Sequence, residues 1–400
     1  MQAHLTNTEA NQSRQILALL SLPNVGKKKV INLMKKIASL PTQAKDLADA
    51  LTEHYPAESI TNNKVEVALE NAEHLLEEHK NRDIKVISFT DPEFPDSLRQ
   101  IDNPPIVLYV KGNYKCLAPE RSIAVIGTRT PTKYGSNRAF RLGQVFGERG
   151  LVVVSGLAKG CDKEGHKGCL SVNGQTVAVL AHGLDQVYPK EHQKLADQIV
   201  DNDGCLVSEH QLGVPPRKNF FVERNRIQSG LSCAVVIVET DLKGGTMHTA
   251  RFCLNQSRIL ACIDHKSENE SNKSRGNKKL LREENAIPLR TSEQLNNFIQ
   301  SKILQSQEPI NPKVLEEIQP TLLPQLPNTL NLNEKSYQKQ WNITRKDLAQ
   351  RLNVTPSTVS KNKSKGKEHF KQWSSKRDPN NFQWCFDEGL KKNVTTYYCL

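Results

Sequence analysis

Residues 123–156 read IAVIGTRTPTKYGSNRAFRLGQVFGERGLVVVSG. An apolar, β-branched run opens this stretch, a helical pattern follows, and a second apolar run closes it. Similar runs follow further along the chain: TVAVLA at 176–181, CAVVIVE at 233–239 and RILACI at 258–263. Runs that are apolar on both faces and alternate with helices are typical of a parallel sheet covered on both sides. The sequence therefore predicts an α/β domain with a Rossmann-like, doubly wound and mostly parallel sheet.

Length and composition exclude several classes of protein. The chain has 400 residues, with 55 Lys and Arg against 43 Asp and Glu and a formal net charge of +12. Two or three domains are expected, because a single core usually stops growing at about 250–300 residues. Neither wholesale disorder nor a membrane protein fits, since no run approaches the ~20 apolar residues that span a bilayer. The first residues lack a hydrophobic signal core, so we expect a cytoplasmic protein without a membrane partner.

The cysteines and the first strand–helix turn argue against a metal or a cofactor. Nine cysteines are scattered through apolar stretches, and no two are separated by two residues, which is the usual spacing of a zinc knuckle. We expect buried free thiols in a reducing compartment. The turn after residue 127 lacks GxGxxG, so no dinucleotide fingerprint is present.

The chain divides into four predicted segments. Residues 12–82 alternate short apolar helical patterns with Lys- and Glu-rich faces, which indicates an all-α domain. Residues 83–300 hold the α/β domain, with 83–114 as its leading segment. Five prolines among Gln, Asn and Leu predict a linker over 301–340. Residues 341–400 carry much of the positive charge and form a small C-terminal domain.

The stretch LLSLPNVGKKKVINLM, residues 19–34, predicts a helix, a tight turn and a second helix. Gly26 lets the backbone approach a phosphate closely, and three lysines open the second helix. The pattern resembles a helix-hairpin-helix (SAM-like) motif, which binds nucleic-acid backbone through amides at a helix N-terminus. A small helical module that only packs against its neighbour is an equal alternative.

Cations and glycines recur where predicted strands end. In an open α/β sheet such loops gather at one edge and form one groove. No matched set of carboxylates accompanies them, which favours binding of a polyanion over acid–base chemistry. Phe220 and Phe221 lie among the cations, as in proteins that stack single-stranded nucleic acid. The candidate binding residues are Arg129, Lys159, Lys218, Phe221, Arg224, Asn225, Arg226, Lys243, Gly245 and Thr246.

Simpler roles compete for several of these residues. Arg224-Asn225-Arg226 could form an ion-pair network at a helix end, and we expect one of Phe220 and Phe221 to lie in the core. Asp162 is expected to be the N-cap of a helix. His166 is expected to be a hydrogen-bonded structural residue rather than a ligand.

An ordered series of motifs resembles the DNA-processing protein A family (DprA/Smf) over about residues 12–300. The motifs are GTR…YG, SGLAxGxD…GH, GLDxxYP, FxxRNRxxSGL, E…GGTxxTA and GNKKLL, preceded by FPDSLRQIDNPPIVLYVKGN at 94–113. The resemblance implies a non-catalytic, homodimeric protein that binds and protects single-stranded DNA. It also implies that the protein helps to load the RecA recombinase during DNA uptake, natural transformation and recombination.

The same resemblance assigns roles to individual residues. By matching motif, Arg129 would bind backbone phosphate, Lys218 and Phe221 would contact DNA, and Lys243 would complete a positive pocket. Gly244 stands where the family usually has Ser, which removes a possible hydroxyl contact to phosphate.

The segment WNITRKDLAQRLNVTPSTVSKNKSK, residues 341–365, predicts two short helices around a turn at Asn353. It resembles a helix-turn-helix or winged-helix-like domain, with Ser357, Thr358 and Lys361 facing outward as DNA-binding candidates. A helical interaction module with a solvated basic face is the alternative.

Two other functions compete with single-strand binding. Gly244-Gly245-Thr246 before a helix is similar to the nucleotide phosphoribohydrolase signature PGGxGTxxE, but KGGTMHTA lacks the second Gly-Thr spacing and the catalytic glutamate. A sequence-specific regulator that acts through residues 344–363 is the other alternative.

Overall fold

The computed structural model describes residues 6–304 except 38, 57–59 and 118. Beyond residue 304 it describes residues 352, 354, 356–363, 370, 372–374, 376, 384–388 and 395–399. The chain forms two compact units, Met1–Glu317 and Ile318–Leu400. Within the described part of the chain, no helix is long and apolar enough to cross a membrane.

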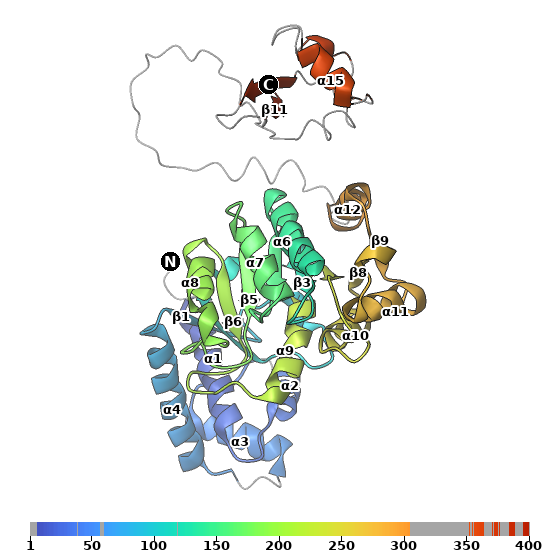
Figure 1. Cartoon of the computed structure of the whole chain (residues 1–400). Helices are drawn as coiled ribbons and strands as arrows, with labels where there is room; N and C mark the ends of the chain where they lie inside the picture. The colour runs from blue at the N-terminus through green and yellow to red at the C-terminus, as the bar shows by residue number, and fades with distance from the viewer. Residues whose placement is uncertain are drawn as a thin grey trace, which may run out of the picture. The chain divides into compact units, whose positions relative to one another are not determined.

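A nine-stranded sheet forms the centre of the first unit (Figure 1), in the order β1-β2-β6-β5-β4-β3-β7-β8-β9. The β1–β2 and β2–β6 pairs are antiparallel, and all other pairs are parallel. This confirms the predicted α/β class with a mostly parallel sheet. The strands are β1 (Ile84–Ser88), β2 (Val107–Gly112), β3 (Ser122–Ile126), β4 (Val152–Ser155), β5 (Thr176–Val179), β6 (Cys205–Ser208), β7 (Ala234–Ile237), β8 (Ile259–Ile263) and β9 (Ile287–Leu289).

Helices cover both faces of the sheet, because successive side chains of its central strands point to opposite sides. Ile123 and Val125 of β3 pack with α6, α7 and α12, whereas Ala124 and Ile126 pack with α9, α10 and α11. Helix α8 packs on Ala178 of β5. The helices are α5 (Asp96–Arg99), α6 (Lys133–Glu148), α7 (Cys161–Leu170), α8 (Gln193–Asp201), α9 (Lys218–Gly230), α10 (Thr246–Asn255), α11 (Arg275–Glu283) and α12 (Ser292–Phe298). Short 3₁₀ helices lie at Tyr114–Leu117, Pro119–Arg121, Lys190–His192, Ser267–Asn269 and Asn272–Ser274 (η6).

The strand order reverses between β3 and β7. From β3 the chain adds β4, β5 and β6 on one side, and then it returns to place β7, β8 and β9 on the other side. The loops that follow β3 and β7 therefore diverge and leave a crevice at the carboxyl ends of these strands. The crevice lies where the sequence predicted a groove.

Five strands coincide with the predicted apolar runs, and four were not predicted from such runs. Strands β1 and β2 lie in the leading segment, the apolar run of β6 is limited to residues 205–207, and β9 has only three residues. Strand β9 contains Pro288, which is tolerated because β9 lies at the edge of the sheet. The π-helix Ile299–Leu304 extends past the predicted boundary at residue 300, because Ile299 and Ile303 are buried in the core.

Four N-terminal helices pack against the edge of the sheet: α1 (Thr6–Ser21), α2 (Lys27–Lys36), α3 (Ala44–His54) and α4 (Asn62–Lys80). The predicted turn is present between α1 and α2, with Asn24 in the left-handed region at φ 63° and Gly26 as the N-cap of α2. Side chains of these helices share one buried cluster with Ile84, Tyr109 and Leu206 of the sheet. The predicted boundary at residue 82 therefore crosses a shared core. The helix-hairpin-helix assignment stays a prediction.

A buried ion pair lies where α2 approaches α9. Arg226 of α9 donates to both carboxylate oxygens of Glu209, at 2.7 and 2.6 Å, and to the carbonyl oxygen of Asn103 at 2.6 Å. The side chains of Arg226 and Glu209 are only 5% and 14% exposed. Burial lowers the pKa of nearby Lys27. The charge of Arg226 lowers this pKa further, whereas the charge of Glu209 opposes the shift. The side chain of Lys27 is half-buried at this junction.

Buried thiols and a buried histidine lie in the first unit. The seven cysteines between residues 116 and 262 are free thiols, and all but Cys233 are buried. His166 of α7 is fully buried, and its Nδ1 lies 2.7 Å from the hydroxyl of Thr176. Thr176 donates that hydroxyl to the carbonyl oxygen of Val153 at 2.6 Å, so it must accept from Nδ1–H of His166. The predicted structural role of His166 agrees with these contacts.

The described part of the second unit contains helix α15, further helical residues at 370 and 372–374, and one pair of antiparallel strands. Helix α15 (Pro356–Lys363) carries Ser357 and Lys361, which are exposed, and Thr358, which is half-buried. Strand β10 (Trp384–Glu388) pairs antiparallel with β11 (Thr395–Cys399). The first helix of the predicted helix-turn-helix lies outside the described residues, so that assignment and the three candidates stay predictions.

Removing one partner of the buried Arg226–Glu209 pair should lower the stability of the protein strongly. We expect Arg226→Leu to lower the free energy of unfolding by about 3–5 kcal/mol, because it leaves the Glu209 carboxylate buried without its partner. The double variant Arg226→Leu/Glu209→Leu should cost less than Arg226→Leu alone. Urea unfolding measures both. Lys159→Ala is the control, because its ion pair with Glu191 is exposed and should contribute at most about 1 kcal/mol. Equal losses in the single and double variants would contradict this account.

Stability should also fall in mild acid because of His166. Burial lowers the pKa of His166 from 6.5 to about 3. Below pH 6.5 the unfolded chain gains a proton at this residue and the folded chain does not, so stability is complete above 6.5 and decreases as the pH falls. One unit below 6.5 the loss from His166 is about 1.4 kcal/mol. Urea unfolding at about pH 7.5 and about pH 5.5 measures the loss of unfolding free energy between the two pH values. This loss should be smaller in His166→Asn than in the unaltered protein. An unchanged difference would show that other groups cause the acid sensitivity.

Candidate functional site

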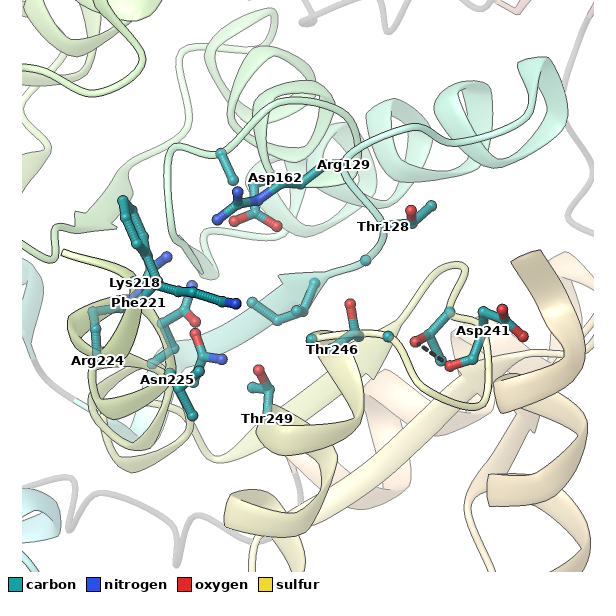
Figure 2. A pocket seen from close by; sticks show the side chains of 18 of the residues that line it. Thr128, Arg129, Asp162, Lys218, Phe221, Arg224, Asn225, Asp241, Thr246 and Thr249 are labelled. Atoms are coloured by element: carbon teal, nitrogen blue, oxygen red, sulfur yellow. Dashed lines mark hydrogen bonds between the residues drawn. The ribbon is translucent and has the colours of Figure 1, made fainter. Parts of the chain in front are cut away.

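A pocket of about 700 Å³ lies at the carboxyl ends of β3 and β7 (Figure 2). Its walls come from the loop after β3, the loop after β7, helix α9 and the start of α10. In Figure 2, Arg129 and Asp162 lie on one side of the pocket, and Thr246 and Thr249 lie on another. The pocket brings together seven of the predicted residues: Arg129, Lys218, Phe221, Arg224, Asn225, Gly245 and Thr246.

Hydrogen bonds to Glu239 hold the loop after β3 in place. The carboxylate of Glu239, which is fully buried, accepts from the backbone N–H of Thr132 at 2.8 Å and from its hydroxyl at 2.5 Å. The Thr132 hydroxyl in turn accepts from the N–H of Gly135 at 3.0 Å and caps α6. The backbone carbonyl of Glu239 accepts from the N–H of Thr128 at 2.8 Å. These bonds fix the segment that carries Arg129.

Arg129, Phe221 and Tyr188 form a stacked series at the rim. The guanidinium carbon of Arg129 lies 5.2 Å from the centre of the Phe221 ring, within the range of a cation–π contact. The rings of Phe221 and Tyr188 are 5.5 Å apart and inclined at 50°. Tyr188 is 46% exposed. The rim therefore offers aromatic surface beside a cation.

The expectation that one of the two phenylalanines lies in the core is wrong. Both side chains are half-buried. Phe220 packs on His210, with ring centres 4.2 Å apart, and on the guanidinium of Arg217. Because consecutive helical residues point in directions about 100° apart, Phe220 faces this cluster while Phe221 faces the pocket.

Arg224 lies at the floor of the pocket as a buried cation. Its guanidinium packs against Gly156, where an added Cβ would lie 1.9 Å from Nη1, and Nη1 donates to the carbonyl oxygen of Val179. Burial lowers the pKa of Arg224 to about 10, and the negative charge of Asp162 opposes this shift. No described residue forms an ion pair with Arg224. Its exposed fraction is only 4%, so Arg224 acts from within the pocket rather than at the surface.

Asp162 is not the N-cap of α7, contrary to the prediction. Gly160 occupies that position, and Asp162 lies inside the first helical turn. Its carboxylate turns back and accepts from the N–H of Gly156 at 3.0 Å. Burial raises the pKa of Asp162, and the nearby charge of Arg224 opposes this effect. Asp162 therefore ties the loop after β4 to the pocket floor.

Three predicted residues do not line the large pocket. Lys159 lines a small adjoining cavity with Arg129, Tyr188 and Phe221, and it forms an exposed ion pair with Glu191 at 3.1 Å. Lys243 is exposed in the loop after β7. Arg226 belongs to the buried ion pair with Glu209, so the helix-end network considered as an alternative describes it better than an open binding site.

Sequence reasoning missed other residues of the pocket. Lys273, from η6, reaches the pocket and donates to the carbonyl oxygen of Thr130. No motif marks Lys273, because tertiary packing alone brings it there. Gln228 and Thr249 also line the pocket. Helical spacing could have indicated both, since they follow Arg224 by four residues and Thr246 by three.

The pocket favours an anion. Its lining residues include four cations and two carboxylates, Asp162 and Asp241. Helix α10 begins at Thr246 and has no side-chain cap on its N-terminal amides, and this end of a helix attracts negative charge. Among the residues that the structure describes, no group of His, Cys, Asp and Glu is placed to hold a metal ion.

Known proteins resemble this chain over the sheet domain. Residues 85–300 match the family model of the DNA recombination-mediator protein A. Protein Smf of Synechocystis sp. is 39% identical over 180 residues, which are 44% of this chain and 45% of that protein. The DNA processing protein DprA of Bacillus subtilis is 36% identical over 201 residues, which are 50% of this chain and 67% of that protein. The alignment thus spans about half the length of the Synechocystis relative and two thirds of the Bacillus one.

A solved structure agrees with the sequence comparisons. The X-ray structure of DNA processing protein A from Streptococcus pneumoniae aligns with a TM-score of 0.55 and 25% identity. The alignment covers 74% of this chain and 95% of that one. Because the family match includes more than half of the chain and contains the strands that build the pocket, the chain belongs to the DNA recombination-mediator protein A family.

Proposed function

We propose that this protein binds single-stranded DNA in the pocket at the β3–β7 crevice. The observation that carries the proposal is the meeting of four cations with the Arg129–Phe221–Tyr188 stack at one site. Phosphate oxygens require cations and amide donors, and unpaired bases stack on aromatic rings. Both kinds of contact are available at this site within one cavity.

The aromatic rim favours a single strand over a duplex. In a duplex the bases are stacked on one another, so their faces cannot reach Phe221 or Tyr188. A single strand can turn its bases toward the rings while its phosphates lie near Arg129 and Lys218. Base–aromatic stacking contributes about 1–3 kcal/mol per base and tolerates different sequences. We therefore expect little dependence on base sequence.

The remaining predicted residues would contribute to binding in different ways. The amides of Gly245 and Thr246 would bind a phosphate at the start of α10. Asn225 would add a polar contact from α9. Lys159 and Lys243 would extend the positive track outside the pocket, where exposed cations attract a flexible strand. Arg226 would position α9 without touching DNA.

The wider role rests on family membership. The relatives in Bacillus subtilis and Streptococcus pneumoniae are named DNA processing protein DprA. We extend the proposal to a non-catalytic, cytoplasmic homodimer that protects single-stranded DNA and helps to load RecA recombinase on it during DNA uptake and recombination. The second unit would contact duplex DNA through Ser357, Thr358 and Lys361 of α15.

Removal or reversal of a positive charge in the pocket tests the proposed binding directly. Lys218→Glu and Arg129→Ala should each weaken binding to an oligo-dT strand at least tenfold, because a hydrogen bond to a charged group contributes about 1.5–3 kcal/mol. Each variant should also make the slope of log affinity against log salt shallower by about 0.7. Fluorescence anisotropy across a salt series measures both.

Lys80→Glu is the matched control for charge reversal. Lys80 is exposed on α4 and lines neither cavity at the crevice. Its reversal should change the affinity less than threefold. If Lys218→Glu and Arg129→Ala bind as tightly as the unaltered protein, the pocket is not the binding site.

Removal of the second unit separates single-strand from duplex binding. A chain that ends at Glu317 keeps the buried Ile299 and Ile303 of the first unit. We expect it to retain affinity for oligo-dT within about threefold and to lose most duplex binding, because the duplex contacts are assigned to α15. Anisotropy with matched single-stranded and duplex probes measures this. Loss of all DNA affinity would instead favour a helix-turn-helix regulator.

A further inference from the structure

Three polar groups at the pocket floor have no hydrogen-bond partner among the described residues. They are Nε of Arg224, Nε2 of Gln228 and Oγ1 of Thr249. Their residues are only 4%, 1% and 1% exposed, and all three line the same pocket. A buried donor without a partner costs about 1–3 kcal/mol, and three of the twelve such atoms among the described residues meet in this one pocket. Three in one cavity indicate a site for a ligand.

The three groups converge from two helices. Arg224 and Gln228 are four residues apart on α9 and therefore share one face of that helix. Thr249 lies on α10, one turn beyond Thr246 and the uncapped N-terminus (Figure 2). Both helices cover the same face of the sheet. The floor therefore presents side-chain donors together with the N–H of Thr246, the first residue of α10.

The chemistry of these groups selects an anion with several acceptor oxygens. Guanidinium and amide nitrogens only donate hydrogen bonds, and the Thr249 hydroxyl can donate as well. Asp162 offsets part of the Arg224 charge but is itself bonded to the N–H of Gly156. A phosphate group fits such a donor set better than a neutral base edge, which also presents donors.

The burial of Arg224, Gln228 and Thr249 favours a terminal phosphate. An internal phosphodiester carries one negative charge and two chain continuations, both of which would have to leave through the mouth of the pocket. A phosphomonoester carries about −1.5 to −2 charges at pH 7 and only one continuation. The volume of about 700 Å³ lies within the range of about 300–1,000 Å³ that is usual for small-ligand sites. Phe221 and Tyr188 at the rim can stack the base of the same nucleotide.

We propose that the floor formed by Arg224, Gln228, Thr249 and the start of α10 binds the phosphomonoester of a single nucleotide. The nucleotide is either a free nucleoside 5′-monophosphate or the 5′-terminal unit of a DNA strand. This inference uses the pocket of the proposed function but not its outer cations. Binding involves no bond cleavage.

Calorimetry with the full chain tests the site with dTMP and with thymidine. We expect dTMP to bind at least tenfold more tightly than thymidine, because only dTMP carries the phosphomonoester. Anisotropy with oligo-dT that bears a 5′-phosphate or a 5′-hydroxyl then identifies the source. Tighter binding of the phosphorylated strand, by about tenfold, assigns the site to strand ends. Equal binding of the two strands, with competition by dTMP, assigns it to free nucleotides.

Thr249→Val is the main variant, because it removes the hydroxyl and keeps the shape. We expect it to weaken dTMP binding about tenfold while Tm stays the same or rises, since it removes an unpartnered buried polar group. Gln228→Met should also weaken dTMP binding. Thr176→Val is the matched control, since its buried hydroxyl is bonded to Val153 and His166. It should lower Tm and leave the preference for dTMP over thymidine unchanged.

Several outcomes would overturn the inference. They are equal affinity for dTMP and thymidine, unaltered dTMP binding in Thr249→Val, and release of free thymine from dTMP, which would indicate an enzyme. The proposed function fails separately. Binding of dTMP without any oligo-dT binding keeps this inference and removes the strand-binding function. Binding of 5′-hydroxyl oligo-dT together with equal affinity for dTMP and thymidine keeps the strand-binding function and removes this inference.

Discussion

The buried carboxylate of Glu239 holds together the point at which the strand order reverses. It accepts from both the amide and the hydroxyl of Thr132, and its backbone carbonyl accepts from Thr128. These bonds join the end of β7 to the loop after β3 and to the capped start of α6. Because charged hydrogen bonds in a buried setting are about twice as strong as neutral ones, the loop has one defined position. Arg129, and with it the aromatic rim, depends on that position.

The fold class and the central strands could be predicted because their signal is local. Continuous apolar runs such as those of β3 and β7 bury both faces of a strand, and the sequence shows this directly. Strands β6 and β9 could not be recognised in the same way, since the apolar run of β6 is limited to residues 205–207 and Pro288 interrupts that of β9. The shared core between the N-terminal helices and the sheet depends on long-range packing, which periodicity does not show.

The candidate site was predicted in part for a similar reason. Loops that follow parallel strands must meet at one edge, so Arg129, Lys218 and Thr246 could be grouped without coordinates. The sequence does not show which of these cations line the pocket and which are held in ion pairs. Arg224 and Arg226 are two residues apart on one helix, yet one lies at the pocket floor and the other is paired with Glu209. Lys273 joins the pocket from a turn that no sequence rule connects to it.

The Arg129–Phe221–Tyr188 stack combines side chains that lie far apart in the sequence. They follow β3, β6 and β5 respectively, so the three side chains come together only when the segment from β3 to α9 is folded. The platform exists only when the sheet is assembled and its loops are in register. A DNA strand that binds there would bind the native state and not the unfolded chain. By mass action it would stabilise the native state by about 2.7 kcal/mol at a strand concentration of a hundred times its Kd. DNA bound at the proposed site would therefore protect the sheet domain against unfolding and proteolysis.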